Sequence, residues 1–207
     1  MEFLIISLLS IILIFVLFAI FGVNMKKLKE MTNIKELDKI SDKYPSNIKI
    51  CKEYLKKLNK ISIGNLRNSY TRIQTIAHEC LHSIQNRKIL LFNFIFSNIY
   101  LIYFFAVLII AIFGKLPNQM ACITTLAILG IVYLIIRMYL ENDAMIKARY
   151  LAKEYMEEKE ISTKEEIEKM IQQYDIVNDL GIKCVHYQLA LNVLAKIAIL
   201  SLVCFWR

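Results

Sequence analysis

Apolar residues along this chain fall into four long runs that are separated by polar segments. The runs occupy residues 3–23, 89–113, 120–139 and 187–206. A helix rises about 1.5 Å per residue, so each run of about 20 residues is long enough to cross the roughly 30 Å of a bilayer's hydrocarbon core. Strand-like alternation is negligible. The pattern therefore predicts an all-α membrane protein with four transmembrane helices.

The first run is either a signal peptide or a retained membrane anchor. A signal peptide carries its basic residues before the apolar run and ends in a small-x-small cleavage site. Here the Lys-rich stretch follows the run, and no such cleavage site comes after it. We therefore expect an N-terminal transmembrane anchor.

The polar segments predict further helices between the spans. Two short amphipathic patterns, at 34–43 and 48–58, precede a longer helical pattern that leads into the second span. The second and third spans are joined by a short turn that contains Pro117, which predicts a hairpin. The chain is thus divided into an anchor, a basic helical segment, a transmembrane hairpin, a second helical segment and a final span: 1–24, 25–88, 89–140, 141–186 and 187–207.

Several signals set the helix ends after the third span. No helix breaker follows that span directly, so its helix should continue to about Glu158. Ser162 with Glu165 three residues later has the form of a capping box, which predicts the start of another helix. That helix should reach Asp179 and end at Gly181.

The distribution of Lys and Arg predicts the orientation in the membrane. The segment 25–88 is rich in both residues, whereas the turn between the second and third spans holds only Lys115. Because Lys and Arg concentrate on the cytoplasmic side of membrane proteins, we expect 25–88 and 141–186 to be cytoplasmic. Both termini would then lie outside, in a multi-pass protein of the plasma membrane.

The formal net charge of +8 raises the question of a nucleic-acid partner. Basic residues beside a first span are explained by topology and by attraction to anionic lipid. No zinc-finger spacing or aromatic-basic RNA-binding motif accompanies them, so we expect contact with the bilayer and not with nucleic acid. The five cysteines include no C-x-x-C pair, so we expect no disulfide framework.

Lys196 lies in the middle of the last apolar run, where a charge is costly. Two interpretations stay open. In the first, the side chain extends its apolar stem toward the membrane interface. In the second, it faces a polar cavity near a functional site.

The segment His78-Glu79-Cys80-Leu81-His82 is an H-E-x-x-H motif within helix-patterned residues. Residues four apart on a helix lie one above the other, so His78 and His82 can both offer a ring nitrogen to one metal ion. Glu79 between them is suited to accept a proton from a water activated by the metal. Cys80 is expected to be a small packing residue. The motif predicts a zinc peptidase site with Glu79 as catalytic base.

A hydrolytic zinc site needs a third protein ligand and an open position for water. His186 is one candidate, but it stands alone at a membrane boundary. Glu141 is better placed, because it follows the third span on the side where we expect the motif. If the second and third spans pair as a hairpin, the motif helix must bend back near residues 86–88 for His82 to reach Glu141.

The chain resembles the membrane zinc metallopeptidases of the YugP-like type, which are akin to the gluzincin group. The resemblance lies in the motif His78-Glu79-x-x-His82 and its order among the spans, followed by Glu141-x-Asp143-Ala144. It implies one zinc ion per chain, held by His78, His82 and Glu141, with Asp143 orienting a ligand histidine. The chain departs from these relatives in lacking a strand-like stretch before the motif, and in having Met145 where related heat-shock membrane peptidases carry Asp.

These observations predict a zinc-dependent metalloendopeptidase that hydrolyses peptide bonds in membrane or membrane-proximal proteins. The site would lie on the cytoplasmic side of the helical bundle. The alternative is a non-catalytic metal-binding scaffold or adaptor that recruits partners through the basic segment 25–88. The lack of a substrate-binding strand favours this alternative, whereas the presence of Glu79 speaks against it.

Overall fold

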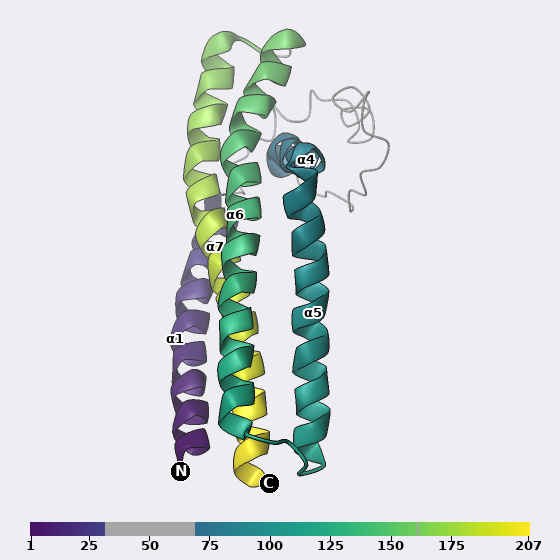
Figure 1. Ribbon diagram of the computed structural model, residues 1–207. Coiled ribbons are helices and arrows are strands. Elements are labelled where there is room, and N and C mark those ends of the chain that lie inside the picture. The colour runs from purple at the N-terminus through teal and green to yellow at the C-terminus, as the bar shows by residue number, and fades with distance from the viewer. Residues whose placement is uncertain (32–68, 161) are drawn as a thin grey trace. The chain divides into compact units, whose positions relative to one another are not determined.

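The computed structural model describes residues 1–31, 69–160 and 162–207, and every regular element in these ranges is a helix (Figure 1). The helices are α1 (Glu2–Met31), α4 (Ser69–Ile84), α5 (Arg87–Ile112), α6 (Gln119–Glu158) and α7 (Lys164–Trp206). The prediction of an all-α protein is therefore confirmed for this part of the chain. The short helices predicted at 34–43 and 48–58 lie outside the described residues.

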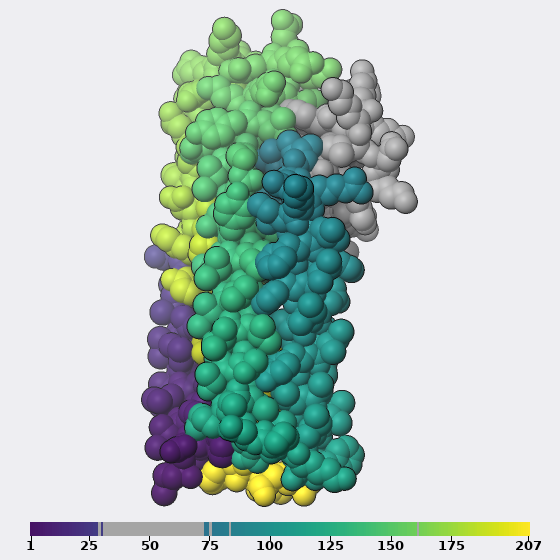
Figure 2. All heavy atoms as spheres, viewed as in Figure 1, coloured from purple at the N-terminus to yellow at the C-terminus, as the bar shows by residue number. Residues whose placement is uncertain are grey.

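Four of these helices are long and apolar enough to cross a membrane: α1, α5, α6 and α7. Many of their exposed side chains are large and apolar; on α5, for example, Phe92, Ile102 and Ile109 are each at least half exposed. Figure 2 shows the surface that α5 presents along its length. A protein in water rarely exposes so much contiguous apolar surface, whereas lipid tails accommodate it. The four apolar helices agree with the predicted multi-pass membrane protein.

The chain divides into two compact units. The first, which we call the membrane unit, comprises Met1–Val23, Arg87–Tyr139 and Cys184–Arg207. The second, which we call the polar unit, comprises Asn24–Asn86 and Leu140–Lys183. Both α6 and α7 contribute to both units, because each helix continues without a break beyond its apolar part.

Residues at the turn between α5 and α6 end one helix and start the next. Gly114, with φ of 67°, adopts the left-handed conformation that favours glycine. Its N–H donates to Ala111 and that of Lys115 to Ile110, which is the Schellman arrangement at a helix C-terminus. The Asn118 side chain then accepts a hydrogen bond from the Ala121 N–H as the N-cap of α6. The predicted turn is confirmed.

A small residue lets the helices of the membrane unit approach closely. A Cβ atom added at Gly130 on α6 would lie 2.6 Å from Cγ1 of Val193 and 3.1 Å from the Tyr100 hydroxyl oxygen. Val193 and Tyr100 belong to the buried cluster of this unit, together with Leu126 and Leu200. Gly130 therefore fixes how near α5 and α7 come to α6.

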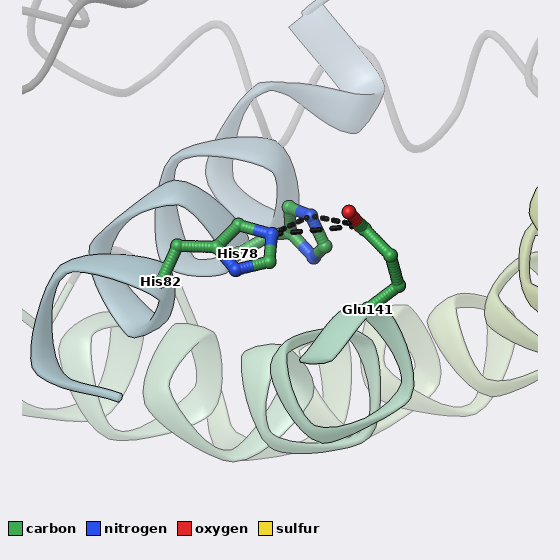
Figure 3. A group of neighbouring side chains, drawn as sticks. All are labelled: His78, His82 and Glu141. Carbon is green, nitrogen blue, oxygen red and sulfur yellow. Dashed lines mark hydrogen bonds and ion pairs between the residues drawn. The ribbon is translucent and has the colours of Figure 1, made fainter. Parts of the chain in front are cut away.

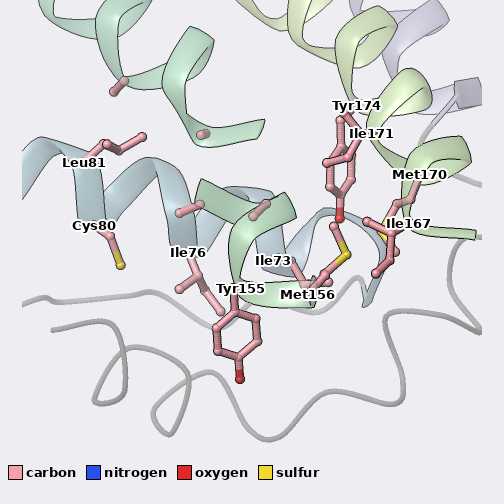
Figure 4. Close-up of a cluster of buried hydrophobic side chains, with 14 residues drawn as sticks. Ile73, Ile76, Cys80, Leu81, Tyr155, Met156, Ile167, Met170, Ile171 and Tyr174 are labelled. Atoms are coloured by element: carbon pink, nitrogen blue, oxygen red, sulfur yellow. The ribbon is translucent and has the colours of Figure 1, made fainter. Parts of the chain in front are cut away.

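The core of the polar unit joins α4 to the later half of α6 and the first half of α7 (Figure 4). On α6, Ala144, Ala148 and Ala152 are fully buried and recur every four residues, so they form one face of the helix. Small side chains on this face let α4 approach the α6 backbone. The buried residues of this core are Ile73, Ile76, Ala77, Cys80, Leu81, Ala144, Ala148, Ala152, Tyr155, Met156, Ile167, Met170, Ile171 and Tyr174. Cys80 is thus a packing residue, as predicted.

A buried hydrogen-bond network crosses this apolar core. The Gln74 amide on α4 donates to the Asn178 side-chain oxygen on α7. The Asn178 amide in turn donates to the Met145 carbonyl oxygen on α6, at 2.8 Å. A buried polar group is costly without partners, so this network favours one alignment of the three helices.

Two predicted helix ends are wrong, one beside a contact between two helices and the other because of the cap residues themselves. α7 does not end at Gly181 but continues to Trp206. A Cβ atom at Gly181 would lie 2.7 Å from the Met145 Cε atom, so the glycine makes room for a neighbouring side chain instead of ending a helix. The capping box lies one residue later than predicted, because Thr163 and Glu166 exchange the two cap hydrogen bonds.

Two other predictions about helix ends are confirmed. The helix of the third span continues without interruption to Glu158. The motif helix α4 ends at Ile84, and α5 starts at Arg87, so the helix is interrupted within a residue or two of the predicted bend. No straight helix therefore connects the H-E-x-x-H motif to the second span.

We predict that Gly130→Ala destabilises the protein by about 1–3 kcal/mol, because the new methyl group meets a stiff β-branched side chain. Gly22→Ala is the matched control, since nothing lies within 4 Å of a Cβ atom at that position. Alanine favours a helix over glycine by about 1 kcal/mol, so this control should be neutral or stabilising. Thermal unfolding in detergent measures both changes, and equal unfolding temperatures for the two variants would contradict the packing argument.

Candidate metal centre

His78, His82 and Glu141 converge at one place in the polar unit (Figure 3). α4 places the two histidines one turn apart, and α6 supplies the carboxylate. The two Nε2 atoms are 3.0 Å apart. The Glu141 Oε2 atom lies 3.6 Å from Nε2 of His78 and 3.5 Å from Nε2 of His82. The structure therefore brings together the three residues that we expected to be ligands.

The spacing of these three atoms fits a small divalent metal ion. Ligand atoms about 2.1 Å from a tetrahedral ion are about 3.4 Å from one another. The three separations, 3.0, 3.5 and 3.6 Å, lie around this value. The side chains retain between 13% and 24% of their exposure, so solvent reaches the site. Two imidazoles and one carboxylate in this arrangement can hold a metal ion and leave a position open.

Gln85 determines which nitrogen of His82 carries a proton. The Gln85 amide nitrogen donates to the Leu140 carbonyl oxygen at 2.7 Å and to the Asp143 carboxylate at 3.2 Å. Its oxygen is therefore the atom that faces Nδ1 of His82, at 3.0 Å. An amide oxygen only accepts, so Nδ1 must be the protonated nitrogen. In the neutral ring this leaves the Nε2 lone pair directed at His78 and Glu141, as a metal ligand requires.

Asp143 acts on His82 through Gln85. One carboxylate oxygen of Asp143 accepts the Gln85 amide, and the other pairs with the Lys147 ammonium one turn later on α6. The resemblance implied that Asp143 orients a ligand histidine, and the structure places one amide between the two residues. The orientation is thus transmitted along a chain from Asp143 to Gln85 to His82.

The electrostatic environment favours positive charge at the His82 ring. The pKa of His82 is raised above its ordinary value, chiefly because the ring hydrogen-bonds to Glu141, while partial burial acts in the opposite direction. The hydrogen bond to Gln85 and the negative charges of Glu141 and Glu79 raise the pKa further. The same carboxylate that stabilises a proton on the ring stabilises a metal ion beside it.

Glu79 lies between the two histidines on α4 and is half buried. Its effect on the pKa of His82 indicates that its carboxylate is near the ring. The group of convergent ligand atoms contains His78, His82 and Glu141 and does not include Glu79 or His186. Glu79 is therefore available for a role other than metal binding.

Comparisons of the chain with protein-family models, with curated proteins and with solved structures found no match. The resemblance to the YugP-like peptidases stays a prediction, which depends on the motif and its order among the spans.

The role of Gln85 is the feature of the site that sequence reasoning missed. Gln85 follows His82 by three residues, so the two side chains share a face of α4. That spacing could have indicated a contact between them. The two acceptors that orient the amide, Leu140 and Asp143, lie on another helix and could not be identified from local spacing.

We predict that Gln85→Ala lowers the affinity of the protein for Zn²⁺ about 10- to 100-fold, because loss of a residue that orients a ligand histidine has this effect in metal sites. The control is Gln172→Ala, which removes an exposed glutamine from α7 in the same unit. Competition with a fluorescent zinc chelator measures both affinities. Unchanged zinc affinity in Gln85→Ala, with the fold intact by circular dichroism, would contradict the assigned role.

Proposed function

We propose that this chain is a zinc-dependent metalloendopeptidase that hydrolyses peptide bonds of membrane or membrane-proximal proteins. The observation that carries the proposal is the convergence of His78, His82 and Glu141 within 4.8 Å of one another. Glu79 adjoins the first histidine in the sequence. This combination matches the two histidines, one carboxylate and separate base of a hydrolytic zinc site.

The donor set favours zinc over other common ions. Imidazole nitrogens suit zinc, copper, iron and nickel, whereas magnesium and calcium prefer sites made of oxygen ligands. Zinc with three protein ligands is typical of hydrolytic sites, in which the fourth position stays open. A bound Zn²⁺ would supply a Lewis acid that lowers the pKa of water toward about 7 and polarises a carbonyl group.

Glu79 and Gln85 would have separate roles in the hydrolysis. The Glu79 carboxylate would accept a proton from the attacking water and return it to the nitrogen of the leaving amine. Gln85 would hold the His82 ring with Nε2 unprotonated, as its hydrogen bonds favour. The incomplete burial of the site, with a quarter or less of each ligand side chain exposed, leaves access for the attacking water.

We predict that Glu79→Gln lowers proteolysis by at least about 100-fold while zinc content is retained, because the amide cannot accept the proton. Glu154→Gln, at an exposed position of α6 in the same unit, is the control and should keep full activity. Glu141→Gln should instead lose zinc. Zinc is measured by elemental analysis of the purified protein, and proteolysis by comparing fragments in the membrane proteome of cells that express each variant.

The outcomes distinguish the peptidase from the scaffold alternative. Purified protein without stoichiometric zinc, or unchanged proteolysis in Glu79→Gln, would refute the proposal. Stoichiometric zinc without any difference in membrane-protein fragments between wild type and Glu79→Gln would favour a metal-binding scaffold. The matched Glu154→Gln variant removes a charge of the same sign, so a general effect of net charge would appear in both.

We further propose that the site faces the cytoplasm, because Lys and Arg are concentrated in the segment before α5. Alkaline phosphatase fused after Arg207 should then be active, since this enzyme folds only outside the cytoplasm. The same reporter inserted after Lys159, between α6 and α7, should be inactive. Green fluorescent protein at the two positions should give the reverse pattern, and activity of the phosphatase at Lys159 would show the opposite orientation.

A further inference from the structure

The Lys196 side chain on α7 does not extend along its own helix toward the final residues of the chain. Its ammonium donates to the Asn192 side-chain oxygen one turn earlier and lies 5.0 Å from the centre of the Tyr100 ring on α5. An ammonium over an aromatic face is attracted by the ring's π electrons. The cation is therefore held by two uncharged groups of the membrane unit, at a position that is partly exposed.

These groups lie near the middle of their apolar helices. Lys196 is about midway along the predicted span 187–206, and Tyr100 is at the centre of α5, which extends from Arg87 to Ile112. Gly130, which approaches the Tyr100 hydroxyl, is near the middle of the apolar part of α6. Polar side chains from two helices, α5 and α7, thus lie near the middle of the hydrocarbon core, where a charge is most costly.

The Tyr100 hydroxyl lacks a partner at this depth. Tyr100 is only 2% exposed, and its hydroxyl has no hydrogen bond among the described residues. The ring stacks on Tyr133 with 5.4 Å between centroids, which fixes its position. A buried hydroxyl is costly unless it is hydrogen-bonded. Because the hydroxyl is enclosed within the membrane unit, Tyr100 supports the Lys196 ammonium through its ring face.

The residues of the membrane unit offer no charged acceptor at that depth. No Asp or Glu occurs within residues 87–139 or 184–207, and the one acidic residue in the remaining part of the membrane unit is Glu2, at the first position of α1. A second copy of the chain offers the same residues, so it supplies no carboxylate in mid-membrane either. Lipid phosphates lie at the surface of the bilayer, about 15 Å from its midplane.

We propose that Lys196 is an intramembrane docking site for a transmembrane helix of another protein that carries Asp or Glu near its midpoint. The carboxylate would accept a hydrogen bond from the Lys196 ammonium, which the Asn192 side chain and the face of the Tyr100 ring hold in place. Each of the two charges is expensive to bury alone, and pairing them removes most of that cost. The site is separate from the metal ligands and does not depend on the proposed peptidase activity.

The test uses the full chain in zwitterionic vesicles with synthetic transmembrane peptides, and measures association by energy transfer between fluorophores. One peptide carries a single Asp at the centre of a Leu-Ala helix, and its control carries Asn there. We expect the wild-type chain to bind the Asp peptide at least tenfold more tightly than the Asn peptide. Lys196→Met should remove this preference, whereas Lys196→Arg should keep it, and so should Tyr100→Phe, which retains the aromatic ring.

A matched control and an alternative ligand complete the test. Lys115→Met removes an exposed lysine from the α5–α6 turn and should leave the preference unchanged. Equal binding of the Asp and Asn peptides, or an unchanged preference in Lys196→Met that is folded by circular dichroism, would overturn the proposal. It would also be overturned if Lys196→Met altered only the enrichment of spin-labelled anionic lipid around the protein, because the ligand would then be a headgroup.

Discussion

The close approach of α4 to α6 is the constraint on which the candidate metal centre depends. Ala144, Ala148 and Ala152 make one face of α6 almost flat, and α4 packs there with Ile76, Ala77 and Cys80 buried in the same core. A larger side chain on this face would separate the two helix axes, because interaxial distance depends on the residues at the contact. The 3.5 Å and 3.6 Å separations between Glu141 and the histidines require this spacing.

Hydrogen bonds then fix the alignment of helices that apolar packing alone leaves variable. Apolar contacts alone allow one helix to slide or rotate slightly on another, since the hydrophobic effect has no direction. The Gln74–Asn178–Met145 network removes that freedom within the core. At the site, Gln85 links the His82 ring to Asp143 and to the Leu140 carbonyl on α6. Each network ends on a backbone carbonyl of α6, at Met145 in the core and at Leu140 beside the site.

Polar side chains of the two units differ in whether they have hydrogen-bond partners. In the polar unit, the buried Gln74 and Asn178 amides have hydrogen-bond partners within the same core. In the membrane unit, the Tyr100 hydroxyl has no partner among the described residues, and the contacts of Lys196 there are with neutral groups. Because a charge without an opposite charge is costly in hydrocarbon, this contrast motivates the docking site proposed at Lys196.

The sequence by itself determined the features that depend on local spacing and hydrophobic length. It predicted the apolar helices, the turn at Pro117 and the pairing of His78 with His82, because each follows from residues close together in the chain. The interruption after the motif followed from requiring His82 to reach Glu141 across the hairpin. The tertiary structure decided the rest. Gly181 does not end a helix because a Met145 side chain from α6 occupies the space beside it. Likewise, the distance of Glu141 from the histidines and the orientation of Gln85 depend on contacts between α4 and α6, which are far apart in the sequence. Helical periodicity shows which face of a helix is apolar, but it does not show which other helix packs against that face.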